Sequence, residues 1–518
     1  MARKMLRYLF GSLILLQLLA CNIDEMLRPG STIGQDIFSA QMFSLSNCTG
    51  EGMFWARDLR TNASYCVKAQ LKASGTHADI YVESQLITSL NYADISNEFD
   101  SKIYPRLEIA FGSAMDLDSN GKIIILILDI RDGSQPGGSF VAGFFDPVNF
   151  FDNEIASLTH SNRSDMLYMD GVELVTLSNK NLSEGKPDAF LATLSHEYQH
   201  LIRFGFEIPH MGATGLRDET WINEGSSEVA ADIAGYAPQG ERIKCYRGNI
   251  AGTCARGVNG SSLFGSSRYN SVVDYAFSYP FMKYIYVSSG STEGERNIFL
   301  KATVQGITGS RAADANGLFE VFRKSSPKYS AASANVLSAL GPDSASTFRK
   351  MFASFLWQSL GDTTPAEAKA GDPSTTGTDI LAQMNSVIGY FPFPASGQFG
   401  AELNDLYSPL RLPDIPPLST LAPGQFHFIR ADRTNANASN GQYLLKKSFS
   451  SVVYSLQVNT EPFRNGDISL SVGLETPSEE PEGFHLPDTG EFTPVCPQDF
   501  IHHLPSPYRT QRFRFRSE

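Results

Sequence analysis

Apolar residues in the middle of the chain recur at helical spacing. Between residues 186 and 204 they return every three or four positions, with Pro187 near the start and Gly205 just past the end, which predicts a helix. A second helical pattern extends from about Thr220 to Gly235, and "DYAFSYPFMKYIYV" continues the same spacing further on. Upstream, "DISNEFDSKIYPRLEIAFG" has the pattern of an amphipathic helix despite its proline. The centre of the chain is therefore predicted to be rich in helices.

Strand patterns flank and interrupt these helices. "KIIILILDI" is a continuous apolar, β-branched run that predicts a buried strand, and residues 22–85 carry strand and turn signals, as in "ADIYVESQ". From about Tyr390, a proline-rich stretch leads into the alternating segments "QYLLKKSFSSVVYSLQV" and "DISLSVGL". Together these patterns predict an α+β protein with a small β-rich N-terminal module at 21–105, a central domain at 106–385 and a β-rich C-terminal module at 386–518.

The first twenty residues have the features of an export signal. Arg3, Lys4 and Arg7 precede the short apolar run 9–20, which is too short to span a bilayer comfortably. The sequence "LLAC" at its end resembles a bacterial lipobox, which places a lipid on Cys21 and anchors the chain to a membrane. A plain cleaved signal peptide is the alternative. Either reading predicts an exported protein, in the cell envelope or secreted.

Charge and cysteine content narrow the range of partners and compartments. The 518-residue chain has a formal net charge of −13 and no basic face, so nucleic acid is not an expected partner. Apart from Cys21 there are five cysteines, and the pairs Cys48/Cys66 and Cys245/Cys254 are close enough in sequence for local disulfides in an oxidising compartment. Cys496 is left over, and the sequence does not settle the connectivity.

The segment "TLSHEYQHLIRFG" holds two of the nine histidines. Residues four apart share a helix face, so His196 and His200 can both point at one ion, while Glu197 lies about 100° further round the helix. From there a carboxylate can reach a water on the ion without being a ligand itself. Chance spacing, with the polar residues facing solvent, is the alternative. The apolar flanks argue against it, because burying these side chains without a partner would cost several kcal/mol.

A catalytic zinc needs a third protein ligand beside two histidines. Glu224, in "DETWINEGSSEVAADIAGY", is the expected third ligand, because residues 201–223 suffice to bring a second helix alongside the first. Glu228 lies one helical turn further on the same face and is expected to orient His196 by accepting its other ring N–H. The reverse assignment of these two glutamates stays open. His210 is a further candidate, although it does not fit the spacing H-E-x-x-H-x-x-G-x-x-H.

These motifs resemble a known group of enzymes. H-E-x-x-H followed by a glutamate in a second helix is similar to the gluzincin zinc metallopeptidases. The fuller text "SHEYQHLIRF", "ETWINEGSSEVAADIAGY" and "DYAFSYPFMKYIY" resembles the hyicolysin family of secreted bacterial peptidases, from about Lys122 to Val287. The resemblance implies a zincin-like metallopeptidase domain with a mixed sheet and active-site helices. "WINEG" is also similar to the aminopeptidase N group, but the G-x-M-E-N exopeptidase signature of that group is absent, which favours cleavage inside chains.

Residue roles follow from the resemblance. It implies zinc on His196, His200 and Glu224, with Glu197 as the general base that takes a proton from water and passes it to the leaving amine. In related peptidases a downstream tyrosine or histidine stabilises the oxyanion, and Tyr275 matches that place best, followed by Tyr279. Packing in an aromatic-rich helix is the alternative for both tyrosines.

The expected function is therefore a secreted or lipid-anchored zinc endopeptidase acting on proteins or peptides. A catalytically inactive surface binding protein of the adhesin type, with a metallopeptidase-like fold, is the alternative from another class, and a zinc aminopeptidase is a variant of the first reading. No G-x-S-x-G elbow and no P-loop occurs in the sequence, so a serine hydrolase and a nucleotidase find no support.

Overall fold

The computed structural model describes most of the chain between residues 48 and 359, with four later segments. The gaps within 48–359 are 62, 135–139, 152–159, 215–217, 249–253, 255–256, 265–270, 309, 327–328 and 330–340, and the later segments are 423–430, 442–449, 452–459 and 494–495. The predicted export signal, Cys21, the segment "DISLSVGL" and Cys496 lie outside the described residues. Within them, no helix combines the length and apolar character that crossing a membrane requires.

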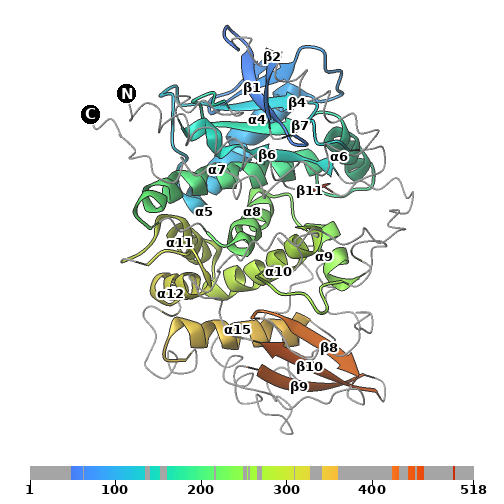
Figure 1. Ribbon diagram of the computed structural model, residues 1–518, viewed down its shortest axis with the longest axis vertical. Helices are drawn as coiled ribbons and strands as arrows, with labels where there is room; N and C mark the ends of the chain where they lie inside the picture. The colour runs from blue at the N-terminus through green and yellow to red at the C-terminus, as the bar shows by residue number, and fades with distance from the viewer. Residues whose placement is uncertain are drawn as a thin grey trace, which may run out of the picture.

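A six-stranded mixed sheet forms the N-terminal part of the described chain (Figure 1). Its spatial order is β1-β2-β3-β4-β7-β6, in which β3, β4 and β7 run parallel and the other pairs are antiparallel. The bounds are β1 Met53–Asp58, β2 Ala63–Ser74, β3 Ala78–Glu83, β4 Ile123–Leu128, β6 Gly143–Phe145 and β7 Met166–Asp170. The predicted buried strand is confirmed as β4, which lies inside the sheet because its apolar side chains are covered on both faces.

The three strands of the predicted N-terminal module share this sheet with strands of the predicted central domain. β3 pairs with β4 in parallel register, with Ile80 opposite Ile125. Strands from both sides of residue 105 thus contribute to one hydrogen-bonded ladder. The division of the chain near residue 105 stays a prediction.

Helices cover one side of the sheet and continue away from it (Figure 1). Their bounds are α4 Tyr92–Glu98, α5 Tyr104–Phe111, α6 Glu173–Ser183, α7 Ala189–Thr214, α8 Thr220–Ala234, α9 Gly240–Arg247, α10 Ser271–Ser289, α11 Glu293–Gln305, α12 Ala315–Ser325 and α15 Ser344–Ser359. A π-helical turn, Phe99–Ile103, joins α4 to α5, so Pro105 falls in the first turn of α5, where a missing N–H is tolerated. The combination of mixed sheet and helices confirms the α+β class.

The β-rich character predicted for the C-terminal part is also present in the described segments. β8 Phe426–Arg430, β10 Val452–Asn459 and β9 Gln442–Phe449 form an antiparallel sheet in that spatial order. Phe426 is fully buried and its ring meets Phe277 of α10 edge-on, with centroids 5.5 Å apart. A two-residue strand, β11 Pro494–Val495, pairs in parallel with β5 Phe140–Val141.

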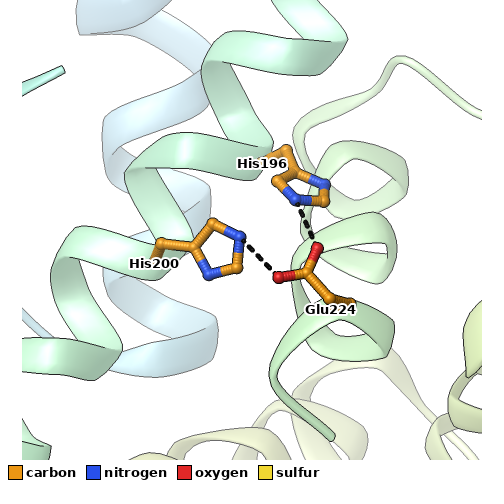
Figure 2. A group of neighbouring side chains, drawn as sticks. All are labelled: His196, His200 and Glu224. Carbon is orange, nitrogen blue, oxygen red and sulfur yellow. Dashed lines mark hydrogen bonds and ion pairs between the residues drawn. The ribbon is translucent and has the colours of Figure 1, made fainter. Parts of the chain in front are cut away.

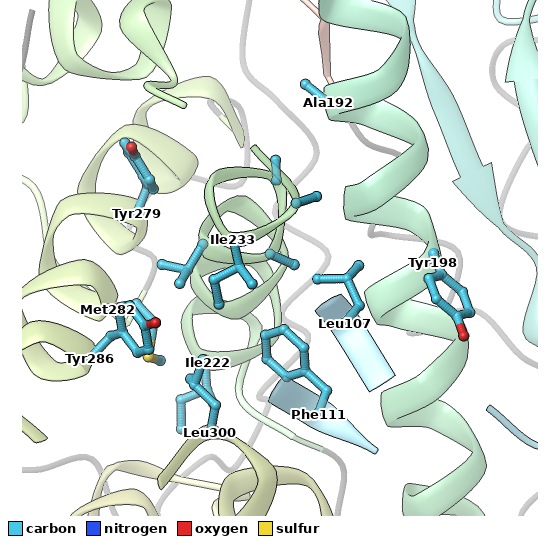
Figure 3. Packing of buried hydrophobic residues seen from close by; sticks show 14 of the residues in the cluster. Leu107, Phe111, Ala192, Tyr198, Ile222, Ile233, Tyr279, Met282, Tyr286 and Leu300 are labelled. Carbon is cyan, nitrogen blue, oxygen red and sulfur yellow. The ribbon is translucent and has the colours of Figure 1, made fainter. Parts of the chain in front are cut away.

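Helix α8 lies inside the hydrophobic core. All but two of its fifteen residues are buried. Figure 3 shows apolar side chains of α8, such as Ile222 and Ile233, lying between Phe111 of α5 and Met282 of α10. A helix that is enclosed in this way is held by its neighbours on every side. Any charged group on α8 therefore needs a partner from another element.

Two disulfides join the cysteine pairs that are closest in sequence. Cys48 is bonded to Cys66, and Cys245 to Cys254. The first ties the segment before β1 to β2. The second ties the end of α9 to Cys254, nine residues after Cys245. Both are the pairs predicted from sequence proximity.

Gly225 permits the close approach of α8 and α10. A Cβ at this position would lie 2.9 Å from both the Ser278 carbonyl oxygen and the Met282 Cβ. We expect Gly225→Ala to lower the free energy of unfolding by roughly 1–3 kcal/mol, because two packed helices would have to move apart. Urea unfolding measures this. Gly294→Ala is the matched control, since nothing lies within 4 Å of its Cβ position in α11, and equal losses in both variants would contradict the explanation.

Glu219 makes stability depend on pH. Its Oε2 accepts hydrogen bonds from Trp221 Nε1 at 2.6 Å and from the Ala315 backbone N–H at 3.2 Å. Its buried Oε1 has no hydrogen-bond partner among the residues that the structure describes. Burial raises the pKa of this carboxyl from 4.5 to about 8, although the Trp221 hydrogen bond opposes the rise. The native state therefore holds this proton more tightly than the unfolded chain does.

The contribution of Glu219 to stability is complete below about pH 4.5 and is lost as the pH rises through about 8. We expect Glu219→Gln to remove this slope, which amounts to at most about 1.4 kcal/mol per pH unit. Denaturant unfolding at pH 5, 6.5 and 8 measures the effect. Glu320→Gln, at an exposed ion pair on α12, is the control, and a pH profile that Glu219→Gln leaves unchanged would refute the assignment.

Candidate metal centre

Helix α7 presents both histidines on one face. It begins just after Asp188, whose Oδ1 accepts the backbone N–H groups of Phe190 at 2.8 Å and Leu191 at 3.2 Å and so caps the first turn. His196 and His200 follow one helical turn apart, and their rings lie edge-to-face with centroids 4.8 Å apart. The helix predicted from the apolar spacing is confirmed and is longer than expected.

Helix α8 brings a carboxylate between the two imidazoles. His196 Nε2 lies 3.1 Å from Glu224 Oε2, and His200 Nε2 lies 3.2 Å from Glu224 Oε1 (Figure 2). The three side chains converge from two neighbouring helices, and each offers one ligand atom within 4.8 Å of the others. They are buried, with Glu224 only 2% exposed. The structure thus brings together the three residues that the sequence assigned to one ion.

The donor set fits a divalent cation such as zinc. Bonds of 2.0–2.1 Å and tetrahedral angles require ligand atoms about 3.3 Å apart, close to the two distances between imidazole nitrogen and carboxylate oxygen. Glu224 Oε1 is buried and has no well-oriented hydrogen-bond donor, so one ligand atom lacks a full partner within the described residues. With both imidazoles neutral, as metal ligands are, the negative charges of Glu197, Glu224 and Glu228 exceed the positive charge of Arg242 by two, which a dication would offset.

Without a metal, the three groups form a buried ion pair. Burial alone would raise the pKa of Glu224, but the neighbouring His200 and His196 lower it to about 2. Burial likewise opposes protonation of His200, yet Glu224 raises the pKa of this imidazole to about 9, with a further contribution from the Glu197 charge. The carboxylate is therefore ionised at neutral pH and ready to bind a cation.

Asn223 and Ser227, which the sequence did not indicate, contact the ring nitrogen of His200 that does not face Glu224. His200 Nδ1 lies 3.1 Å from Asn223 Oδ1 and 3.2 Å from Ser227 Oγ. An N–H on Nδ1 directs the other ring nitrogen, Nε2, toward Glu224. Asn223 and Ser227 are four apart on α8, so the spacing that identified the histidines could have indicated this pair as well.

Glu228 was expected to accept the outer ring N–H of His196, and in the structure it lies near this nitrogen but not within hydrogen-bond distance. Its Oε1 lies 3.8 Å from His196 Nδ1 and accepts a hydrogen bond from Arg242 Nε at 2.8 Å. The guanidinium carbon of Arg242 in turn lies 4.9 Å from the centre of the Tyr275 ring. Arg242 was not anticipated, because only the packing of α9 against α10 brings this side chain to Glu228.

The remaining candidates lie at different distances from the centre. Glu197 is 1% exposed, and the ring of Tyr275 lies 6.4 Å from that of His196. The hydroxyl of Tyr279 instead donates to Asp232 at 2.8 Å, one turn of α8 beyond Glu228. His210 belongs to α7 and lies ten residues past His200, about 15 Å along the helix axis.

Comparison with known proteins gives one informative similarity. No protein-family profile matches the chain. Over 245 residues the chain is 30% identical to the neutral metalloprotease ShpI of Staphylococcus hyicus. This aligned stretch covers 47% of this chain and 52% of ShpI. The chain thus spans about half the length of the curated relative it matches. Together with the cluster of His196, His200 and Glu224, this similarity supports a metallopeptidase family.

Proposed function

We propose that this protein is a zinc metalloendopeptidase of the hyicolysin type that hydrolyses peptide bonds in protein substrates. The observation that carries the proposal is the carboxylate of Glu224 between the Nε2 atoms of His196 and His200, in a buried site. The similarity to a neutral metalloprotease supports the same class. Two imidazoles and one carboxylate leave a tetrahedral zinc one open position for water or substrate.

In the proposed mechanism, His196, His200 and Glu224 hold the zinc ion. Zinc, when bound, supplies a Lewis acid that acidifies water and polarises the scissile carbonyl. Glu197 follows His196 directly on α7 and acts as general base: its carboxylate accepts a proton from the attacking water and then donates it to the leaving amine nitrogen.

Surrounding side chains keep the ligands in place. Asn223 and Ser227 fix the ring of His200. Glu228, held by Arg242, faces the ring of His196. These contacts reduce the movement that each ring must lose when the metal binds.

Tyr275 remains our candidate for stabilising the oxyanion. Its ring lies near both His196 and the guanidinium of Arg242. A phenol hydroxyl at such a place can donate a hydrogen bond to the negative charge that develops on the carbonyl oxygen.

We propose an exported enzyme, anchored through a lipid on Cys21. The two disulfides are typical of an oxidising compartment. Labelling with a palmitate analogue that disappears in Cys21→Ala would support the anchor, and labelling that persists would exclude it.

Glu197→Gln separates metal binding from turnover. We expect this variant to keep its zinc by elemental analysis and to lose casein degradation by a factor of about 10²–10⁴, because the base is gone while the ligands remain. A zinc chelator should abolish wild-type activity. Glu320→Gln, at an exposed pair on α12, controls for the chemical change.

Wild-type protein that holds zinc and degrades no protein would instead favour the adhesin-type alternative, and cleavage restricted to free N-termini would favour an aminopeptidase.

Glu228→Gln tests the support of His196. We expect zinc affinity to fall about 10- to 100-fold, because the neutral amide interacts more weakly with Arg242 and with the imidazole. Competition with a chromophoric chelator measures the dissociation constant. An affinity equal to that of the wild type would show that Glu228 does not act on the metal centre.

A further inference from the structure

A small cavity opens beside His196. It has a volume of about 100 Å³ and is bounded by the start of α7, the end of α6, the segment before α7 and the first turn and a half of α9. Glu228 also lines it. A cavity of this size holds several waters, or one side chain. Because a proposed zinc ligand forms part of its wall, a substrate residue seated here would lie next to the scissile bond.

The inner surface of this cavity is formed mainly by small apolar groups. Ala142, Ala192 and Ala231 line it from the sheet edge, α7 and α8, and Leu177 lines it from α6. Such a surface suits the methylene stem of a short side chain. It provides little area for a large aliphatic or aromatic side chain.

Two lysines from different elements line the cavity: Lys186, in the segment before α7, and Lys244, on α9. Glu241 of α9 lines it as well. Lys186 pairs with Glu184 at 2.7 Å and Lys244 with Glu241 at 2.7 Å, and each of these four side chains is between 34% and 42% exposed. Ion pairs that exposed contribute little, so either lysine can exchange its partner for an incoming carboxylate.

The pKa of Glu184 shows the effect of the lysines at the mouth of the cavity. The hydrogen bond from Lys186 lowers the pKa of this carboxyl, and the charges of Lys180 and Lys244 lower it further. A carboxylate held near these lysines is thus favoured in its ionised form. Deeper in the cavity, Arg242 is paired with Glu228, so this pair adds little net charge.

We infer that this cavity is a specificity pocket for an acidic side chain, Asp or Glu, in the substrate residue next to the scissile bond. The inference rests on the proposed peptidase function and adds to it a substrate class. The stem of the side chain lies against the alanines, and its carboxylate lies between Lys186 and Lys244. Outside this spot the protein is strongly acidic, with a net charge of −13, so a local pair of lysines also reduces the repulsion of an acidic substrate.

Internally quenched peptides with blocked ends test the pocket. Cleavage sites are first mapped on casein by mass spectrometry, and one cleaved sequence is then made with Glu, Gln, Ala or Lys on either side of the scissile bond. For the wild type we expect kcat/KM to be about five- to tenfold higher with Glu than with Gln at one of the two positions. In the double variant Lys186→Gln/Lys244→Gln this ratio should fall to near one. Lys301→Gln, an exposed lysine on α11, is the matched control and should keep both rate and ratio.

A binding measurement separates this inference from the proposed function. Fluorescence anisotropy of the same Glu and Gln peptides on Glu197→Gln protein reports affinity without turnover, and the Glu peptide should bind more tightly, with a difference that shrinks at high salt. Equal binding and equal cleavage of the two peptides, or a Glu preference that survives in the double variant, would overturn the pocket and leave the peptidase intact. A wild type that cleaves no peptide would overturn the peptidase, while tighter binding of the Glu peptide would still support the pocket.

Discussion

The pairing of one buried carboxylate with two imidazoles sets the geometry on which the rest of this structure depends. Glu224 lies on a helix that is enclosed on nearly every side, and its charge there would cost several kcal/mol without compensation. His196 and His200 supply that compensation from the neighbouring α7. The contact therefore fixes the register of α7 against α8. It also leaves a set of nitrogen and oxygen atoms that a single divalent cation can bind.

The need to compensate a buried carboxylate recurs along α8. Glu224, Glu228 and Asp232 are spaced four residues apart, so they follow one face of the helix. Their nitrogen-bearing partners come from three different elements: the two histidines from α7, Arg242 from α9 and Lys283 from α10. A buried helix with three acids is thus stable only when all three neighbours are in place. The candidate metal centre therefore depends on the same contacts that pack the helical region.

The two histidines that we propose as metal ligands are supported unevenly. His200 is held by neutral groups at hydrogen-bond distance, Asn223 and Ser227. His196 faces a carboxylate that is itself engaged by Arg242 and lies further away. His196 also borders the cavity to which we assign substrate recognition. The side of the centre where substrate is proposed to bind is therefore the side whose support depends on Arg242 of α9.

Local patterns in the sequence determined the parts that depend on neighbours along the chain. Four-residue spacing placed His196 and His200 on one face of α7, helical period located α8 with Glu224 upon it, and sequence proximity indicated both disulfides. Only the tertiary structure decided how strands from residues 53–83 enter the same sheet as β4, where Arg242 meets Glu228, and that lysines from two segments face one cavity. These features depend on distances between segments far apart in the chain, which hydrophobic period does not encode. The distance of Glu228 from His196 belongs to the same group, since it is set by competition with a guanidinium from another helix.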